Sequence, residues 1–262
     1  TPAVEDGGTP EITLGVNDGE ADPVTQTFTL TVTVVITLTN NNDTVDYSAG
    51  TAPYRVYALN GTDTVTGTPF NDVLVGGDGQ DTLTGGAGDD VFESEYLDAD
   101  HWEHYDVIDG GEGFDTVRGT QGEDSLIRLR FVDRDASNNA YDHSIDAIAG
   151  GSPENFNKLL GSRWYDYIDL RAIVVSEIDA FELSDGDDVF WGTDDGDFIQ
   201  GGDGYDTLYG EGGDNVFYVT RADGDHWEHP DYIEGGEGWD VVMGKEGEDS
   251  LIRLRFVDRD AS

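Results

Sequence analysis

Residues 67–93 read as three consecutive repeats of nine residues: Gly67-Thr-Pro-Phe-Asn-Asp-Val-Leu-Val75, Gly76-Gly-Asp-Gly-Gln-Asp-Thr-Leu-Thr84 and Gly85-Gly-Ala-Gly-Asp-Asp-Val-Phe-Glu93. Each repeat has Gly at position 1, Asp at position 6 and an apolar residue at position 8. A fixed period is typical of folds in which a short unit buries its apolar face by stacking on its neighbours. These repeats therefore predict a solenoid of short strands.

The same pattern continues on both sides and then recurs. It covers most of residues 58–127 and of residues 183–252, and each block is interrupted by one seven-residue spacer. Residues 122–137 and 247–262 are identical, 125 residues apart. We therefore predict two tandem solenoid units, at residues 38–160 and 161–262, with the second unit truncated.

The first 37 residues follow a different pattern. Phe28, Leu30, Val32 and Val34 alternate with threonines, which indicates a strand with one apolar face. We expect residues 1–37 to be the tail of an upstream β-sandwich-like domain or a cap on the solenoid, and the former is favoured. The absence of an initiator Met suggests a segment of a longer chain.

The charge of the chain indicates a bound cation. Asp and Glu number 57 against 13 Lys and Arg, for a net charge of −44. Disordered acidic chains have few aromatic residues, whereas this chain has 11 Phe, 12 Tyr and 5 Trp. A folded cation binder is therefore the better interpretation, and nucleic acid, which requires clustered Lys and Arg, is not an expected partner.

Composition also excludes cysteine-based sites and membrane-spanning segments. The chain has no cysteine, so disulfides and thiolate metal sites are ruled out. No apolar run is long enough to span a membrane.

Each position of the repeat suits a hard cation. Glycine allows a positive φ, so the backbone can turn tightly and direct carbonyl groups toward one point. The Asp at position 6 adds a carboxylate beside these carbonyls. Oxygen ligands without nitrogen or sulfur favour calcium. Because one loop offers too few oxygens for such an ion, stacked loops must share it.

This pattern resembles the RTX (repeats-in-toxin) family, whose repeat is G-G-x-G-x-D-x-U-x with U apolar. The resemblance implies an all-β fold, a parallel β-roll or β-helix with calcium ions between successive turns. Carried over by position, the implied metal ligands are Asp63, Asp72, Asp81, Asp90, Asp106, Asp115, Asp124, Asp166, Asp188, Asp197, Asp206, Asn215, Asp231, Asp240 and Asp249. Asn215 replaces Asp at position 6, and Phe70 and Asp195 replace the Gly at position 4. These repeats are expected either to bind weakly or to mark the ends of rows.

The resemblance also implies a function. It points to a monomeric structural or adhesive segment of a large bacterial protein that is secreted or surface-bound, exported by a type I system and folded by calcium outside the cell. No catalytic motif is found, so we expect no enzyme activity. An accessory domain of a secreted polysaccharide-modifying enzyme is the weaker alternative.

Three other groups of residues leave alternatives open. The repeated His-Trp-Glu-His at 101–104 and 226–229 is either a modified turn, which is favoured, or a transition-metal or ligand site. Aromatic residues could stack on sugars in a carbohydrate-binding module, or could cover irregular turns. They are Trp102, Tyr105, Trp164, Tyr165, Tyr167, Trp191 and Trp227.

The third group is a repeated set of arginines. We expect them to pair with carboxylates across strands, and an anionic ligand is the alternative. They are Arg128, Arg130 and Arg134, with Arg253, Arg255 and Arg259 in the second copy.

Overall fold

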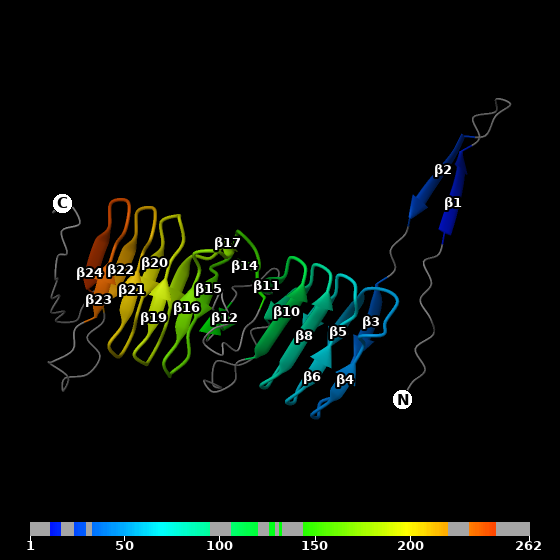
Figure 1. The fold of residues 1–262 in the computed structure, drawn as a ribbon, viewed down its shortest axis with the longest axis horizontal. Helices are drawn as coiled ribbons and strands as arrows, with labels where there is room; N and C mark the ends of the chain where they lie inside the picture. Colours follow the sequence, from blue (N-terminus) through cyan, green and yellow to red (C-terminus); the bar gives the residue numbers. More distant parts are fainter. Residues whose placement is uncertain are drawn as a thin grey trace.

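A computed structural model describes residues 11–16, 24–29, 33–94, 106–119, 126–128, 131–132, 144–219 and 231–244. The regular structure of these residues is β-strand throughout, and they contain no helix that could cross a membrane. From β3 onward every strand pairs in parallel with the strand one turn away (Figure 1). The prediction of an all-β parallel solenoid is confirmed.

The first part of the solenoid has two sheets, and the chain alternates between them. The first sheet has seven strands: β3 (Val34–Thr37), β5 (Tyr54–Tyr57), β7 (Val73–Val75), β9 (Val91–Ser94), β11 (Thr116–Gly119), β14 (Ala147–Ala149) and β17 (Val174–Ser176). The second has four strands: β4 (Thr44–Asp46), β6 (Thr64–Thr66), β8 (Thr82–Ala87) and β10 (Val107–Glu112). The nine-residue repeat therefore equals one loop and one strand, and two repeats complete a turn.

The last part also has two sheets, but these are new ones. One has six strands: β12 (Leu126–Arg128), β15 (Lys158–Leu160), β18 (Ala180–Glu182), β20 (Phe198–Gln200), β22 (Val216–Val219) and β24 (Val241–Gly244). The other has five: β13 (Phe131–Val132), β16 (Tyr167–Asp169), β19 (Val189–Trp191), β21 (Thr207–Tyr209) and β23 (Tyr232–Glu234).

Between these parts the solenoid has three sheets. From β11 to β19 the chain contributes strands in turn to the seven-, six- and five-stranded sheets. We placed the boundary between the two units between residues 160 and 161. β15 lies before this boundary and pairs with β18, which lies after it. The six-stranded sheet thus continues across the predicted boundary, and the division of the chain into two units stays a prediction.

The N-terminal segment divides between two structures. β1 (Glu11–Val16) and β2 (Val24–Thr29) form an antiparallel two-stranded sheet. β3, which also lies within the first 37 residues, instead pairs in parallel with β5 and so begins the solenoid. The origin of residues 1–37 in an upstream domain stays a prediction.

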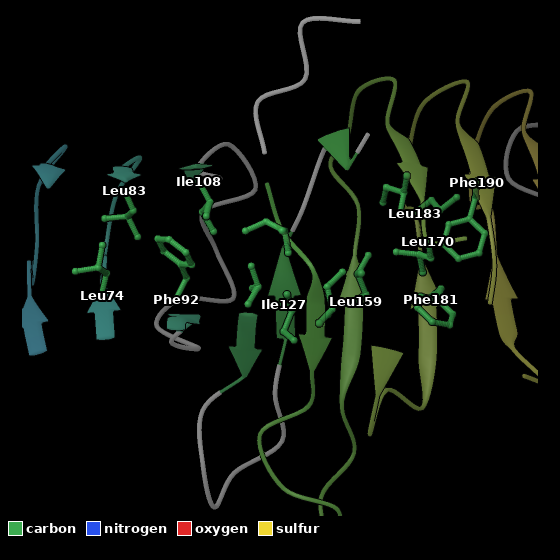
Figure 2. Packing of buried hydrophobic residues seen from close by; sticks show 14 of the residues in the cluster. Leu74, Leu83, Phe92, Ile108, Ile127, Leu159, Leu170, Phe181, Leu183 and Phe190 are labelled. Atoms are coloured by element: carbon green, nitrogen blue, oxygen red, sulfur yellow. The ribbon is translucent and has the colours of Figure 1, made fainter. Parts of the chain in front are cut away.

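One apolar side chain from each repeat fills the interior. Figure 2 shows these side chains, among them Leu74, Phe92 and Phe190, in a row between the sheets. Most of them occupy position 8, and those of the inner turns are at most 5 % exposed. The repeat at residues 119–127 is an exception: counting nine residues from Gly119 predicts Leu126 at position 8, but Ile127 is the fully buried residue and aligns with Leu159. That assignment was one residue out of register.

Outward side chains also form rows along the sheets. Glu93 of β9 accepts hydrogen bonds from Arg118 of the neighbouring strand β11 and from Arg55 of β5, which lies two strands away in the seven-stranded sheet. On the five-stranded sheet, the rings of Trp191 and Tyr209 stack with centroids 5.2 Å apart. Such cross-strand pairs add to the stability of the sheet.

Candidate metal centres

The loops depend on glycine because successive turns touch through their backbones. Gly79 has a φ of 134°, and a Cβ added there would lie 1.6 Å from the carbonyl oxygen of Gly61, one turn earlier. Gly204 lies in the same way against Gly186, at 1.7 Å. This close stacking directs backbone carbonyl oxygens of each loop toward the next loop.

The carboxylate at position 6 lies inside the loop and links it to the preceding turn. Oδ1 of Asp81 accepts a hydrogen bond from the backbone N–H of Asp63 at 2.8 Å, and Oδ1 of Asp90 accepts one from Asp72 at 2.7 Å. The Oδ1 atoms of other predicted ligands make the same contact: Asp63, Asp72, Asp106, Asp115, Asp188, Asp206, Asn215, Asp231 and Asp240.

The second oxygen of many of these carboxylates has no hydrogen-bond partner. It is buried and unpaired in Asp63, Asp81, Asp90, Asp115, Asp188 and Asp206. Each of these side chains is fully buried. An unpaired buried carboxylate oxygen is costly. A bound cation would remove this cost.

Further oxygens converge on the same places. A Cβ added at Gly85 would lie 2.2 Å from Oδ2 of Asp90 and 2.6 Å from the carbonyl oxygen of Gly110, which belongs to the next turn. A Cβ added at Gly76 would lie 2.5 Å from Oδ2 of Asp81 and 3.0 Å from Oδ2 of Asp106. Oxygens from two turns that lie close to one point fit a shared hard cation, and calcium accepts this ligand set.

Burial without a partner raises the pKa of these groups in the metal-free protein. Desolvation, and next the charge of Asp166, raises the pKa of Asp188 to about 9. Desolvation likewise raises the pKa of Asp90 and Asp206 to about 7 and that of Asp81 to about 6. A cation that binds here therefore competes with protons.

Four predicted ligands have different surroundings. Asp72, Asp166 and Asp197 accept hydrogen bonds from a Thr or Ser four residues earlier. The amide of Asn215 donates to backbone carbonyl groups. Asp124 and Asp249 lie outside the described residues, and the ligand roles of all these side chains stay predictions.

Sequence reasoning missed two acidic residues that follow the same geometry. Asp146 and Asp179 accept hydrogen bonds from the backbone N–H groups of Asp115 and Asn157, each one turn earlier. Both precede an inward apolar residue by two positions, and this spacing was the available signal.

Other predicted groups fall mostly outside the described residues. This applies to both His-Trp-Glu-His segments, to Tyr105 and to Arg130, Arg134, Arg253, Arg255 and Arg259. Arg128 lies in β12, and its side chain is not described. The hypotheses about a transition-metal site and an anionic ligand stay untested.

In the described part of the chain, no three His, Cys, Asp or Glu side chains cluster as a metal site. Backbone carbonyl groups would therefore have to supply many of the ligands. A family model described as the RTX calcium-binding nonapeptide repeat matches four segments, at residues 57–92, 106–129, 191–221 and 230–251. No curated protein matches the chain.

Proposed function

Since this chain belongs to the RTX calcium-binding nonapeptide-repeat family over the matched residues, we propose that it is a calcium-dependent structural and adhesive module. The observation that carries the proposal is the set of six buried carboxylate oxygens without a partner. They lie in a chain of net charge −44, in which bound cations would also offset the repulsion between turns.

The module acts outside the cell, as a segment of a large bacterial protein. Where calcium is scarce, the unpaired carboxylates oppose stacking, so the chain stays unfolded and suits export by a type I system. Where calcium is abundant, the ion joins the turns and folding follows binding. The same sites thus couple folding to location.

The module has a mechanical rather than a catalytic role. The buried carboxylates of the described residues lie at position 6 of the repeat, apart from Asp169, which forms an ion pair with Arg171. These groups serve the solenoid itself, and none of them is left over as an acid or a base.

Calcium removal tests the proposal. The full chain in EGTA should show weak β signal in circular dichroism, and millimolar calcium should restore it cooperatively. Magnesium at the same concentration should fail, because it requires a rigid octahedral site. Equal β content in chelator and in calcium would contradict the proposal.

Adhesion through aromatic side chains is the more specific part of the proposal. Trp164, Tyr165 and Tyr205 lie on loops that lead into the five-stranded sheet, and Trp164 is 58 % exposed. Exposed aromatic groups often mark interaction sites, and they stack well on sugar rings. A glycan array in calcium buffer, with Trp164→Ala as the comparison, tests this role; equal signals from both proteins would remove Trp164 from it.

A further inference from the structure

We infer that calcium binds in only some of the repeats: loops whose position-6 carboxylate keeps an unpaired oxygen hold an ion, whereas loops closed by a hydroxyl or an amide of the protein hold none. The inference rests on calcium as the ion of the proposed function. It goes further by assigning the ions to particular loops and therefore to particular edges of the solenoid.

Hydroxyl groups close one class of loop. In the repeat that begins at Gly67, the N–H and the hydroxyl of Thr68 donate to Oδ2 and Oδ1 of Asp72, at 2.5 and 3.0 Å. Ser162 donates in the same way to Asp166, at 2.6 and 2.8 Å. Both oxygens of these carboxylates have protein donors, so an ion is not required to balance them.

The third loop of this class follows the same pattern. The N–H and the hydroxyl of Thr193 donate to Oδ2 and Oδ1 of Asp197, at 2.7 and 3.0 Å. The donor stands at position 2 in all three repeats.

The backbone conformation at position 2 decides whether a loop keeps an unpaired carboxylate oxygen or is closed by a hydroxyl. Where it has positive φ, as at Gly77, Gly86 and Gly202, the carboxylates that follow keep an unpaired oxygen. Ser184 also stands at position 2 but has a φ of 80°, and its carboxylate, Asp188, is unpaired as well. The hydroxyl alone is therefore not sufficient; the N–H must also turn toward the carboxylate.

Amide groups close a second class of loop. Nδ2 of Asn215 donates to the carbonyl oxygens of Gly212 at 3.2 Å and of Gly235 at 3.1 Å. Gly235 belongs to the next turn and is the counterpart of Gly110, which faces the carboxylate of Asp90. The amide therefore places hydrogens where the carboxylate repeats have two oxygens facing each other.

Asn157 is similar, except that both carbonyl groups that accept from its amide belong to its own loop. Its Nδ2 atom donates to the carbonyl oxygens of Ser152 at 2.9 Å and of Asn155 at 3.3 Å. In both repeats the asparagine satisfies carbonyl groups that would otherwise be available to an ion.

The two classes are not distributed evenly around the solenoid. The loops that precede β15, β20 and β22 carry Asn157, Asp197 and Asn215, all closed by protein donors, and they form one edge of the last part. The loops that precede β19 and β21, on the opposite edge, carry the unpaired Asp188 and Asp206. The loop before β16 lies on the edge of Asp188 and Asp206, but Ser162 closes it, so the contrast between the edges holds for the loops from β19 to β22. There the solenoid should bind calcium along one edge, whereas the first part has unpaired carboxylates on both edges, as at Asp81 and Asp90.

A matched pair of variants in adjacent repeats tests the assignment. Asp206→Asn and Asp197→Asn make the same chemical change at position 6, on opposite edges. Equilibrium dialysis of the full chain against radioactive calcium should show one bound ion fewer for Asp206→Asn than for wild type. Asp197→Asn should bind as many ions as wild type, because the change affects a carboxylate that Thr193 already satisfies.

A second variant keeps the test decisive if Asp197→Asn does not fold. Asn215→Asp replaces the closing amide with a carboxylate, so it should raise the calcium midpoint for folding in circular dichroism at least twofold, or add one bound ion. The inference would be overturned if Asp206→Asn and a folded Asp197→Asn lost the same number of ions. It would also be overturned if Asn215→Asp had the ion count and the calcium midpoint of wild type. A wild-type chain that binds no calcium would instead contradict the proposed function.

Discussion

The loop glycines are constrained by atoms of the next turn rather than by their own neighbours in sequence. Gly79 combines a φ of 134° with a carbonyl oxygen of the preceding turn at the place of a Cβ. Any side chain at this position would strain the backbone and push the turns apart, and the metal-binding carbonyl groups would move with them.

Gly79→Ala should therefore destabilise the calcium-loaded protein by at least about 2 kcal/mol, the cost of a strained backbone conformation. Chemical denaturation followed by circular dichroism measures it. Thr82→Ala, an exposed position three residues later on β8, is the matched control and should change stability by less than about 1 kcal/mol. Equal effects of the two substitutions would show that the turns can separate at low cost.

Each strand of the solenoid contributes mainly one inward side chain, so the core is one row of apolar groups. Phe190 of β19 is fully buried and packs against Phe181 of β18, with ring centroids 5.1 Å apart. The rings thus link two sheets within one turn, and the buried side chains of Leu170 and Leu183 lie beside them (Figure 2).

Phe190→Ala should cost about 3–5 kcal/mol, the usual range for a buried phenylalanine. Trp239→Ala is the control, because Trp239 is 78 % exposed and should contribute little. Thermal unfolding in saturating calcium compares them. A similar fall in the two melting temperatures would mean that the buried row is not what stabilises the strands.

The buried carboxylates of the whole molecule make the metal-free fold depend on pH. Burial raises the pKa of Asp188 from 3.8 to about 9 and that of Asp206 to about 7. A folded state with raised pKa values binds more protons than the unfolded state. Its stability is therefore fully present below pH 3.8 and is lost as the pH rises through 7 and 9.

In EGTA, the β signal should therefore be stronger at pH 5 than at pH 8, the reverse of the usual effect of acid on a salt-bridged protein. Saturating calcium should reduce this difference, because the ion replaces the protons. Circular dichroism across this range measures it, with Asp188→Asn expected to weaken the dependence in EGTA. A metal-free chain that gains structure as the pH rises would refute the prediction.

The repeat pattern and its resemblance to the RTX family were sufficient to predict the parallel solenoid and the apolar row. A period of nine residues, glycine at position 1 and an apolar residue at position 8 each act within one loop and one strand. Prediction became inaccurate where the chain enters a new sheet at β12, and the register of Ile127 is the example.

Tertiary structure decided the rest, because the backbone conformation of a loop depends on the turn stacked against it, as where the N–H of Asp203 donates to the carbonyl oxygen of Ser184. Ser162 and Ser184 stand at the same position of the repeat, yet only Ser162 closes its loop, and the φ of 80° at Ser184 makes the difference. Likewise, the change from two sheets to three between β11 and β19 depends on strands that pair 22–36 residues apart. The identity of each residue was visible in the sequence, but the backbone stacked against it was not.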